Sequence, residues 1–147
     1  MRELVELQSG QVAFISGLMS GFSLAVAAHV LRYGIRSRVA QATFLLLLLT
    51  SLLFLLALYT ETRLGIEFAG REAVPADVLA SVAEVRAMGT GGATIAFFLF
   101  VASIGLIGWL ANPLTGILST LIAGATFVAL ALAWHDIGEI SARLAGS

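Results

Sequence analysis

Four apolar blocks, each without Asp, Glu, Lys or Arg, constrain the fold of this chain more than any other feature. They cover about residues 10–31, 40–60, 88–111 and 114–135. A transmembrane helix needs about 20 predominantly apolar residues to cross the hydrocarbon core. Charged residues are 12% of the chain, roughly half of the usual fraction in a soluble domain. The sequence therefore predicts an all-α, polytopic membrane protein with four transmembrane helices in a single domain, residues 1–147.

The composition argues against several classes of protein. Cysteine is absent, so disulfides and thiolate metal sites are excluded. The two histidines, His29 and His135, are too few for a histidine metal cluster, and a net charge of −1 gives no reason to expect nucleic-acid binding. The interiors of the second, third and fourth predicted spans contain no Asp, Glu, Lys, Arg or His. We therefore expect no enzyme, no cofactor and no nucleic-acid partner, and a location in the plasma (inner) membrane.

The first block is rich in small and polar residues, whereas the second is almost continuous leucine between Leu45 and Leu58. Small residues at a spacing of four let transmembrane helices approach closely. A heptad register also places one set of side chains along a single seam of the first span, as in a left-handed helix bundle. These residues are Gln11, Ile15, Leu18, Phe22, Ala25 and His29. A ring of such helices would enclose an apolar tube that can gate ions by dewetting.

Several of these residues have a second interpretation. His29 is either the mouth of a pore, where it could also bind a metal ion, or an ordinary histidine at the headgroup level. Glu3 and Glu6 precede the first span and would concentrate cations in a ring, or they form a solvated helix start. The stripe of small residues serves either helix packing or pore lining, and the two roles are compatible.

The connections between the predicted spans are short, with one exception. Residues 2–9 are expected to be helical and continuous with the first span, and residues 32–38 form a basic turn. Residues 61–86 form the longest connection, and a further helix is expected to start at Pro75–Asp77. Pro113 predicts a turn after the third span. The high density of arginine in the first turn places this turn in the cytoplasm. The segments on the other side of the membrane contain more arginines in total and favour the opposite orientation, so the orientation stays open.

The first span, from Ser16 through Ser20-Gly21-Phe22 to His29, resembles the pore helix of the Orai calcium channels, the store-operated channel family. That family has a Ser-Gly-Phe motif, a hydrophobic gate and then a glutamate ring seven residues after the Phe. The third and fourth spans are also similar, over Ala96–Trp109 and Ser119–His135. The likeness covers all four spans in order and length.

The resemblance implies an oligomer, typically a hexamer, with the first helix of each subunit at the centre. It implies a hinge at Gly21, a hydrophobic gate at Phe22 and Ala25, and a selectivity ring at His29. Histidine is not the hard oxygen ligand that calcium prefers, so calcium selectivity is in doubt. The family's basic residues at the cytoplasmic end of the pore helix are missing, and its acidic residue in the third span is Ser103 here.

Three functions therefore remain open from the sequence. The preferred one is a cation channel that resembles the Orai family and conducts an ion such as calcium through a homo-oligomer in the lipid bilayer. The second is a small integral subunit or scaffold of a larger membrane complex. The third is a small-solute transporter that works as a dimer.

Overall fold

The computed structural model of the protein describes residues 2–68 and 76–145, and every regular element in them is an α-helix. The four helices are α1 (Arg2–Tyr33), α2 (Arg38–Phe68), α3 (Ala76–Ala111) and α4 (Pro113–Ala145). Each contains an apolar segment long enough to cross a membrane: Gly10–Arg32, Arg38–Glu67, Ser81–Ala111 and Pro113–Asp136. The predicted all-α class with four candidate spans is confirmed, and the chain has the architecture of a polytopic membrane protein.

The helices begin and end close to the predicted boundaries, except around the longest connection. Residues 2–9 continue into the first span as predicted, and α3 ends at Ala111, directly before the Asn112–Pro113 turn. The longest connection is shorter than the predicted residues 61–86, while the helix expected to start at Pro75–Asp77 is confirmed. There α2 runs on to Phe68 and α3 already begins at Ala76. A helix satisfies its own backbone hydrogen bonds, so its extension beyond the apolar block costs little near a membrane surface.

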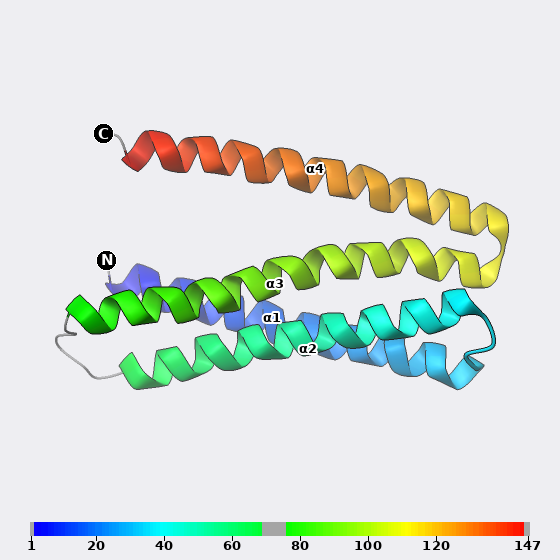
Figure 1. Ribbon diagram of the computed structural model, residues 1–147, viewed down its shortest axis with the longest axis horizontal. Coiled ribbons are helices and arrows are strands. Elements are labelled where there is room, and N and C mark those ends of the chain that lie inside the picture. The colour runs from blue at the N-terminus through cyan, green and yellow to red at the C-terminus, as the bar shows by residue number, and fades with distance from the viewer. Residues whose placement is uncertain (1, 69–75, 146–147) are drawn as a thin grey trace. The chain divides into compact units, whose positions relative to one another are not determined.

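The helices α1 and α2 form an antiparallel hairpin in which they lie side by side (Figure 1). The connection between them is short because Gly34 adopts φ 88°, a left-handed conformation that glycine accepts without strain. The Gly34 N–H donates to the Leu31 carbonyl at 3.1 Å and closes the end of α1. Ser37 caps α2, since its Oγ accepts a hydrogen bond from the Ala40 N–H at 3.0 Å.

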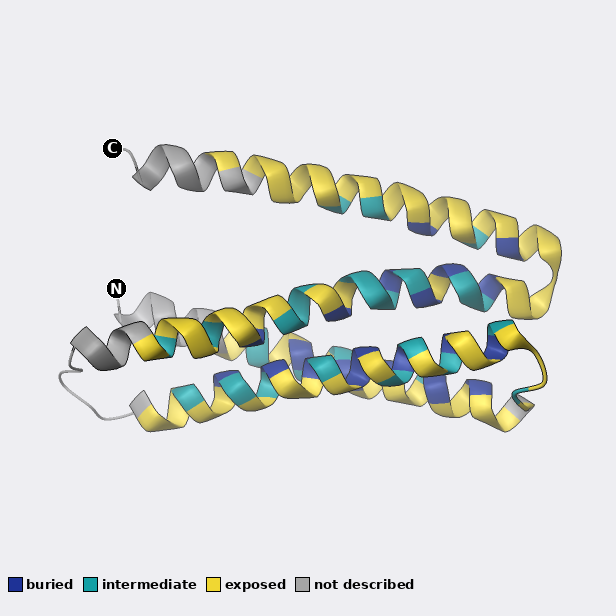
Figure 2. Ribbon diagram, viewed as in Figure 1, coloured by how far each residue is buried: buried dark blue, intermediate teal, exposed yellow. Residues whose placement is uncertain are grey.

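Both helices of this hairpin bury one seam with alternating spacings of three and four residues, visible as dark blue patches in Figure 2. This is the spacing of helices that pack in a left-handed pair. The seam of α1 is built from small residues, whereas that of α2 alternates small with large side chains. The buried residues are Ser16, Ser20, Ser23, Ala27 and Val30 on α1, and Ala40, Thr43, Leu47, Thr50, Ser51, Phe54, Ala57 and Glu61 on α2.

The chain divides into two compact units, Met1–Phe100 and Val101–Ser147. The first contains α1, α2 and the beginning of α3. The second contains the end of α3 and all of α4. The single domain over residues 1–147 stays a prediction.

Glycines allow α3 and α4 to approach closely within the second unit. A Cβ atom on Gly105 would lie 3.1 Å from the Ala123 Cβ, and one on Gly108 would lie 2.6 Å from the Thr115 carbonyl oxygen. Asn112 caps α4, because its Oδ1 accepts a hydrogen bond from the Thr115 N–H at 2.8 Å. Pro113 then occupies the first helical position, where its missing N–H costs nothing.

Candidate functional site

The predicted pore-lining seam of α1 lies on an exposed face of the hairpin. Ile15, Leu18 and Phe22 are 54%, 63% and 57% exposed, although they are among the larger apolar side chains of the helix. Gln11, Ala25 and His29 are exposed as well. At about 100° per residue, this seam is centred about 140° around the helix from the seam that packs on α2. The packing of α1 on α2 therefore leaves the predicted seam uncovered.

The buried side of α1 meets α2 through hydroxyl groups. The Ser20 and Ser51 side chains lie 3.0 Å apart, and each hydroxyl can donate to the backbone carbonyl of the other residue, at 3.0 Å and 3.1 Å. Reciprocal bonds of this kind hold two backbones close together where lipid provides no hydrophobic driving force between helices. They fix the register of α1 on α2, and with it the direction of the exposed seam.

Three other hydroxyls on the same interface are buried without a hydrogen-bond partner: Ser23 Oγ, Thr43 Oγ1 and Thr50 Oγ1. All three residues are completely buried. A buried polar group without a partner costs free energy compared with an apolar group of the same shape. The interface therefore retains its hydroxyls at a cost in stability.

Phe22, the predicted gate residue, has one aromatic contact within the first unit. Its ring packs edge-on against the ring of Phe100 on α3, with centroids 5.9 Å apart and an interplanar angle of 69°. Edge-to-face pairs at such distances are favourable because the ring edge is positive and the ring face negative. The contact gives Phe22 a defined orientation while more than half of its surface stays exposed.

The remaining predicted residues are placed as follows. Gly21 lies within the continuous helix α1, and open space surrounds the position that a Cβ atom would occupy there. This space is compatible with the predicted hinge but does not test it. Glu3 and Glu6 lie outside the side chains that the structure describes. Among the described residues, no group of three or more His, Asp and Glu side chains could hold a metal ion.

An ion pair between a buried carboxylate and a partly exposed arginine connects α2 to α3, and the sequence did not predict it. Glu61 was expected in a loop, but it lies within the long apolar segment of α2 and its side chain is only 2% exposed. Its Oε1 lies 3.8 Å from the Arg86 Nε on α3, and its Oε2 has no hydrogen-bond partner. Glu61 and Arg86 lie just outside the predicted spans 40–60 and 88–111 but inside the longer candidate spans of α2 and α3. The heptad spacing from Ala40 to Glu61 was the available signal.

The pair lies beside a close contact of the same two helices. A Cβ atom on Gly89 would meet the Thr60 side chain at 3.1 Å, so glycine is the residue that lets α3 approach α2 here. An ionisable residue inside a membrane span generally marks either a functional site or a fixed helix contact.

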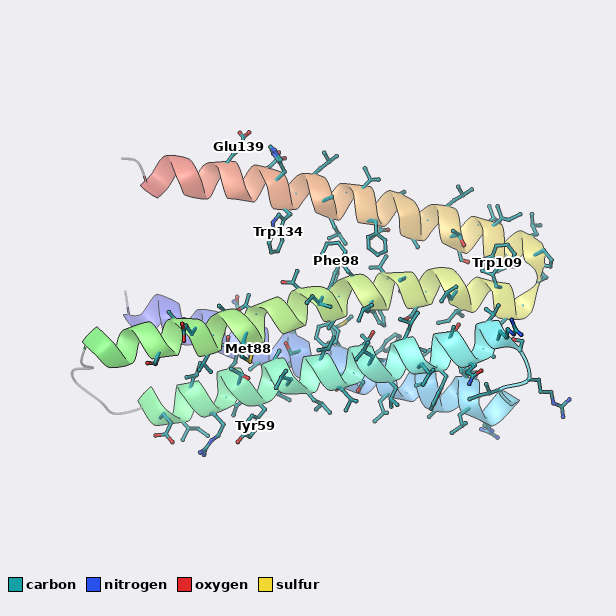
Figure 3. The ribbon with its side chains drawn as sticks, in the orientation of Figure 1. Tyr59, Met88, Phe98, Trp109, Trp134 and Glu139 are labelled. Carbon is teal, nitrogen blue, oxygen red and sulfur yellow. The ribbon has the colours of Figure 1, made fainter. Side chains whose placement is uncertain are left out.

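Aromatic side chains lie toward the ends of the helices, as interfacial anchors would. The Trp109 Nε1–H donates to the Thr120 Oγ1 at 3.0 Å, within the second unit. Figure 3 shows Tyr59 on α2 and Trp134 on α4, and both side chains are more than 60% exposed. Amphipathic rings at these positions suit the boundary between headgroups and hydrocarbon.

Comparisons with protein families, with curated proteins and with solved structures found no match for this chain. The geometry of the hairpin and the residues on its exposed face are therefore the basis for proposing a function.

Proposed function

We propose that the protein is an oligomeric cation channel similar to the Orai calcium channels, with α1 lining the pore. The observation that carries this proposal is the division of α1 into two faces. One face packs on α2 through small hydroxyl residues, and the other presents Ile15, Leu18 and Phe22 without a covering helix from the hairpin. A ring of α1 helices would bury that second face around a common axis.

The order of residues along the exposed seam also suits a gated pore. Polar residues stand at its two ends, Gln11 and His29, and the side chains between them are apolar. A narrow apolar constriction between two hydrated ends loses its water and blocks the passage of ions until it widens or becomes polar. Phe22 has the largest side chain of this stretch, and its contact with Phe100 would set how far the ring projects toward the axis.

The permeant ion is proposed only as a small cation. Calcium-binding sites use oxygen ligands, mainly carboxylates, carbonyls and water. His29 stands where the Orai family has its glutamate ring, so selectivity for calcium should be weaker than in that family.

An accessory subunit of a larger membrane complex is the second candidate. It is favoured by the exposed leucine face of α2, which includes Leu45 and Leu52 at 54% and 56% exposure. Such a face contacts either lipid or another membrane protein. A subunit of this kind would be isolated with its partner and would conduct no ions by itself.

Ion flux from liposomes tests the channel directly. Wild type, Phe22→Ala and Leu24→Ala would be purified, reconstituted at equal density and loaded with potassium or calcium. Leu24 is the matched control, because it is 51% exposed on the same helix but points away from the predicted seam. We expect Phe22→Ala to raise cation flux severalfold and Leu24→Ala to leave it unchanged. No measurable ion flux through any of the three proteins, each shown to be folded, would reject the channel and favour the accessory subunit.

A further inference from the structure

The connection between α1 and α2 concentrates positive charge at one end of the hairpin. Arg32 lies in the last turn of α1, Arg36 in the connection and Arg38 at the first position of α2. All three are exposed. The candidate spans of the two helices end at Arg32 and begin at Arg38. The three guanidinium groups therefore lie where the hydrocarbon core gives way to the headgroups.

The connection is too short for these charges to separate. Between the two helices only residues 34–37 remain. The Arg36 N–H donates to the Gly34 carbonyl at 3.1 Å, and the Gln41 N–H donates to the Ser37 carbonyl at 3.1 Å. A connection with its own backbone hydrogen bonds holds the three arginines as one cluster rather than as a loose tail.

The carboxylates of α1 and α2 are too far along the helices to neutralise this cluster. The nearest acidic residues along the two helices are Glu6, at the start of α1, and Glu61 on α2. At a rise of about 1.5 Å per residue, both lie more than ~30 Å from the arginines along the helix axes. Residues 87–135 contain no Asp, Glu, Lys or Arg at all. Among the described residues, no acidic side chain forms an ion pair with Arg32, Arg36 or Arg38.

The other arginines whose side chains the structure describes, Arg63 and Arg86, have acidic partners. Arg63 lies 3.8 Å from Glu67, and Arg86 lies 3.8 Å from Glu61.

A further copy of the chain would not change the excess of positive charge at the basic turn. Subunits in a ring around α1 share one orientation, so each copy would bring its own arginines, and no carboxylate, to the same face of the membrane. The hairpin therefore brings no carboxylate of its own to the turn, which leaves the three arginines available to an anionic partner in the membrane.

We propose that the turn formed by Arg32, Arg36 and Arg38 binds the phosphate groups of anionic lipids. Guanidinium groups bind phosphate oxygens through paired hydrogen bonds. Arginine stems can lie along the apolar boundary while their charged ends reach the phosphates. Clusters of basic residues next to a transmembrane helix attract anionic headgroups. This inference is independent of the proposed channel, because it concerns how the hairpin is held in the bilayer.

The test is the thermal unfolding of the full chain in nanodiscs of phosphatidylcholine, with and without phosphatidylglycerol. We expect phosphatidylglycerol to raise the unfolding midpoint of wild type and to have little effect on R32Q/R36Q/R38Q. Removing each arginine should weaken the apparent lipid affinity about fivefold, and high salt should reduce the effect. Arg63→Gln is the matched control, since Arg63 is an exposed arginine with an acidic partner, and it should keep the full stabilisation.

Three further arms decide between the sources of the negative charge. The variant R32K/R36K/R38K keeps the positive charge and should keep at least part of the stabilisation by phosphatidylglycerol. This variant also allows the test to be made if the glutamine variant fails to fold. Equal stabilisation of wild type and the glutamine variant by phosphatidylglycerol would overturn the proposal. So would equal stabilisation of wild type by inorganic phosphate in phosphatidylcholine nanodiscs, because the site would then bind a soluble anion. Bound phosphatidylglycerol in native mass spectra of wild type, absent from the glutamine variant, would support the proposal.

Discussion

Ser20 and Ser51 show how single small residues determine the packing of this hairpin. Each side chain is short enough for the backbones to come close, and each can donate to the carbonyl of the other residue. In lipid, association of helices depends on close packing and on hydrogen bonds between them. The same two residues set which side of α1 faces α2, and therefore which residues stay available for other contacts.

At the residue scale, His29 distinguishes the proposed channel from the calcium-selective family it resembles. We expect His29→Glu to place a ring of carboxylates at the mouth and to increase block of monovalent current by calcium at least tenfold. Current block would be measured in planar bilayers over a calcium titration, with His29→Gln as the neutral control. Unchanged calcium block in the glutamate variant would remove His29 from the pore.

Gly108 offers a second prediction at this scale. A methyl group there would meet the Thr115 carbonyl oxygen at 2.6 Å and collide with the Ser119 side chain. A backbone carbonyl inside a helix cannot move aside cheaply, so Gly108→Ala should destabilise the α3–α4 packing by about 1–3 kcal/mol. Gly91→Ala is the matched control on the same helix, because nothing lies within 4 Å of its added Cβ. Equal unfolding midpoints in detergent for the two variants would contradict this packing.

At the scale of elements, an ion pair and a close glycine contact attach α3 to α2. Glu61 and Arg86 bring opposite charges together near one end of the two helices, and Gly89 packs on Thr60 directly beside them. Burial of a charge is costly unless it is paired, so each residue of the pair makes the other tolerable. This contact determines where α3 starts relative to α2.

Neutralising one member of the pair should therefore cost more than neutralising both. We expect Arg86→Gln to destabilise the protein by about 3 kcal/mol, because it leaves a buried carboxylate without a counter-charge. The double variant E61Q/R86Q should recover a large part of that loss. The comparison would be made by unfolding in detergent with all three variants and wild type. Additive losses in the double variant would show that the two side chains act independently.

At the scale of the whole molecule, the proposed oligomer requires α1 helices from different subunits to meet. The chain has no cysteine, so a single introduced cysteine reports contacts between subunits without interference. Leu18→Cys places a thiol in the middle of the exposed seam, and Leu24→Cys places one on the same helix, turned away from that seam. Disulfides need Cα atoms within about 7 Å.

We therefore expect mild oxidation in membranes to cross-link Leu18→Cys into dimers and to leave Leu24→Cys largely monomeric. The products would be separated by non-reducing electrophoresis. Cross-linking of Leu24→Cys alone would mean that α1 helices meet through a different face. A protein that stays monomeric in both variants, while folded and inserted, would contradict assembly around α1.

Length and hydropathy along the sequence were enough to predict the four helices and most of their boundaries. These properties are local, because a helix in lipid must be apolar over about 20 residues whatever its neighbours are. The connection predicted over residues 61–86 was too long, although the helix start at Pro75–Asp77 was predicted. The charged residues of this connection suggested a segment exposed to water. In the structure Glu61 and Arg86 instead continue their helices and form an ion pair.

Heptad spacing predicted one seam on α1, with Leu18 and Phe22, while the seam with Ser20 and Ser23 was not predicted. Both follow the heptad spacing, so periodicity alone could not decide which one packs on α2. The tertiary structure decided in favour of the serine seam, since its small residues are buried and Ser20 forms hydrogen bonds with Ser51 across the interface. That choice depends on the shape and polarity of a second helix, which the pattern of one helix does not contain.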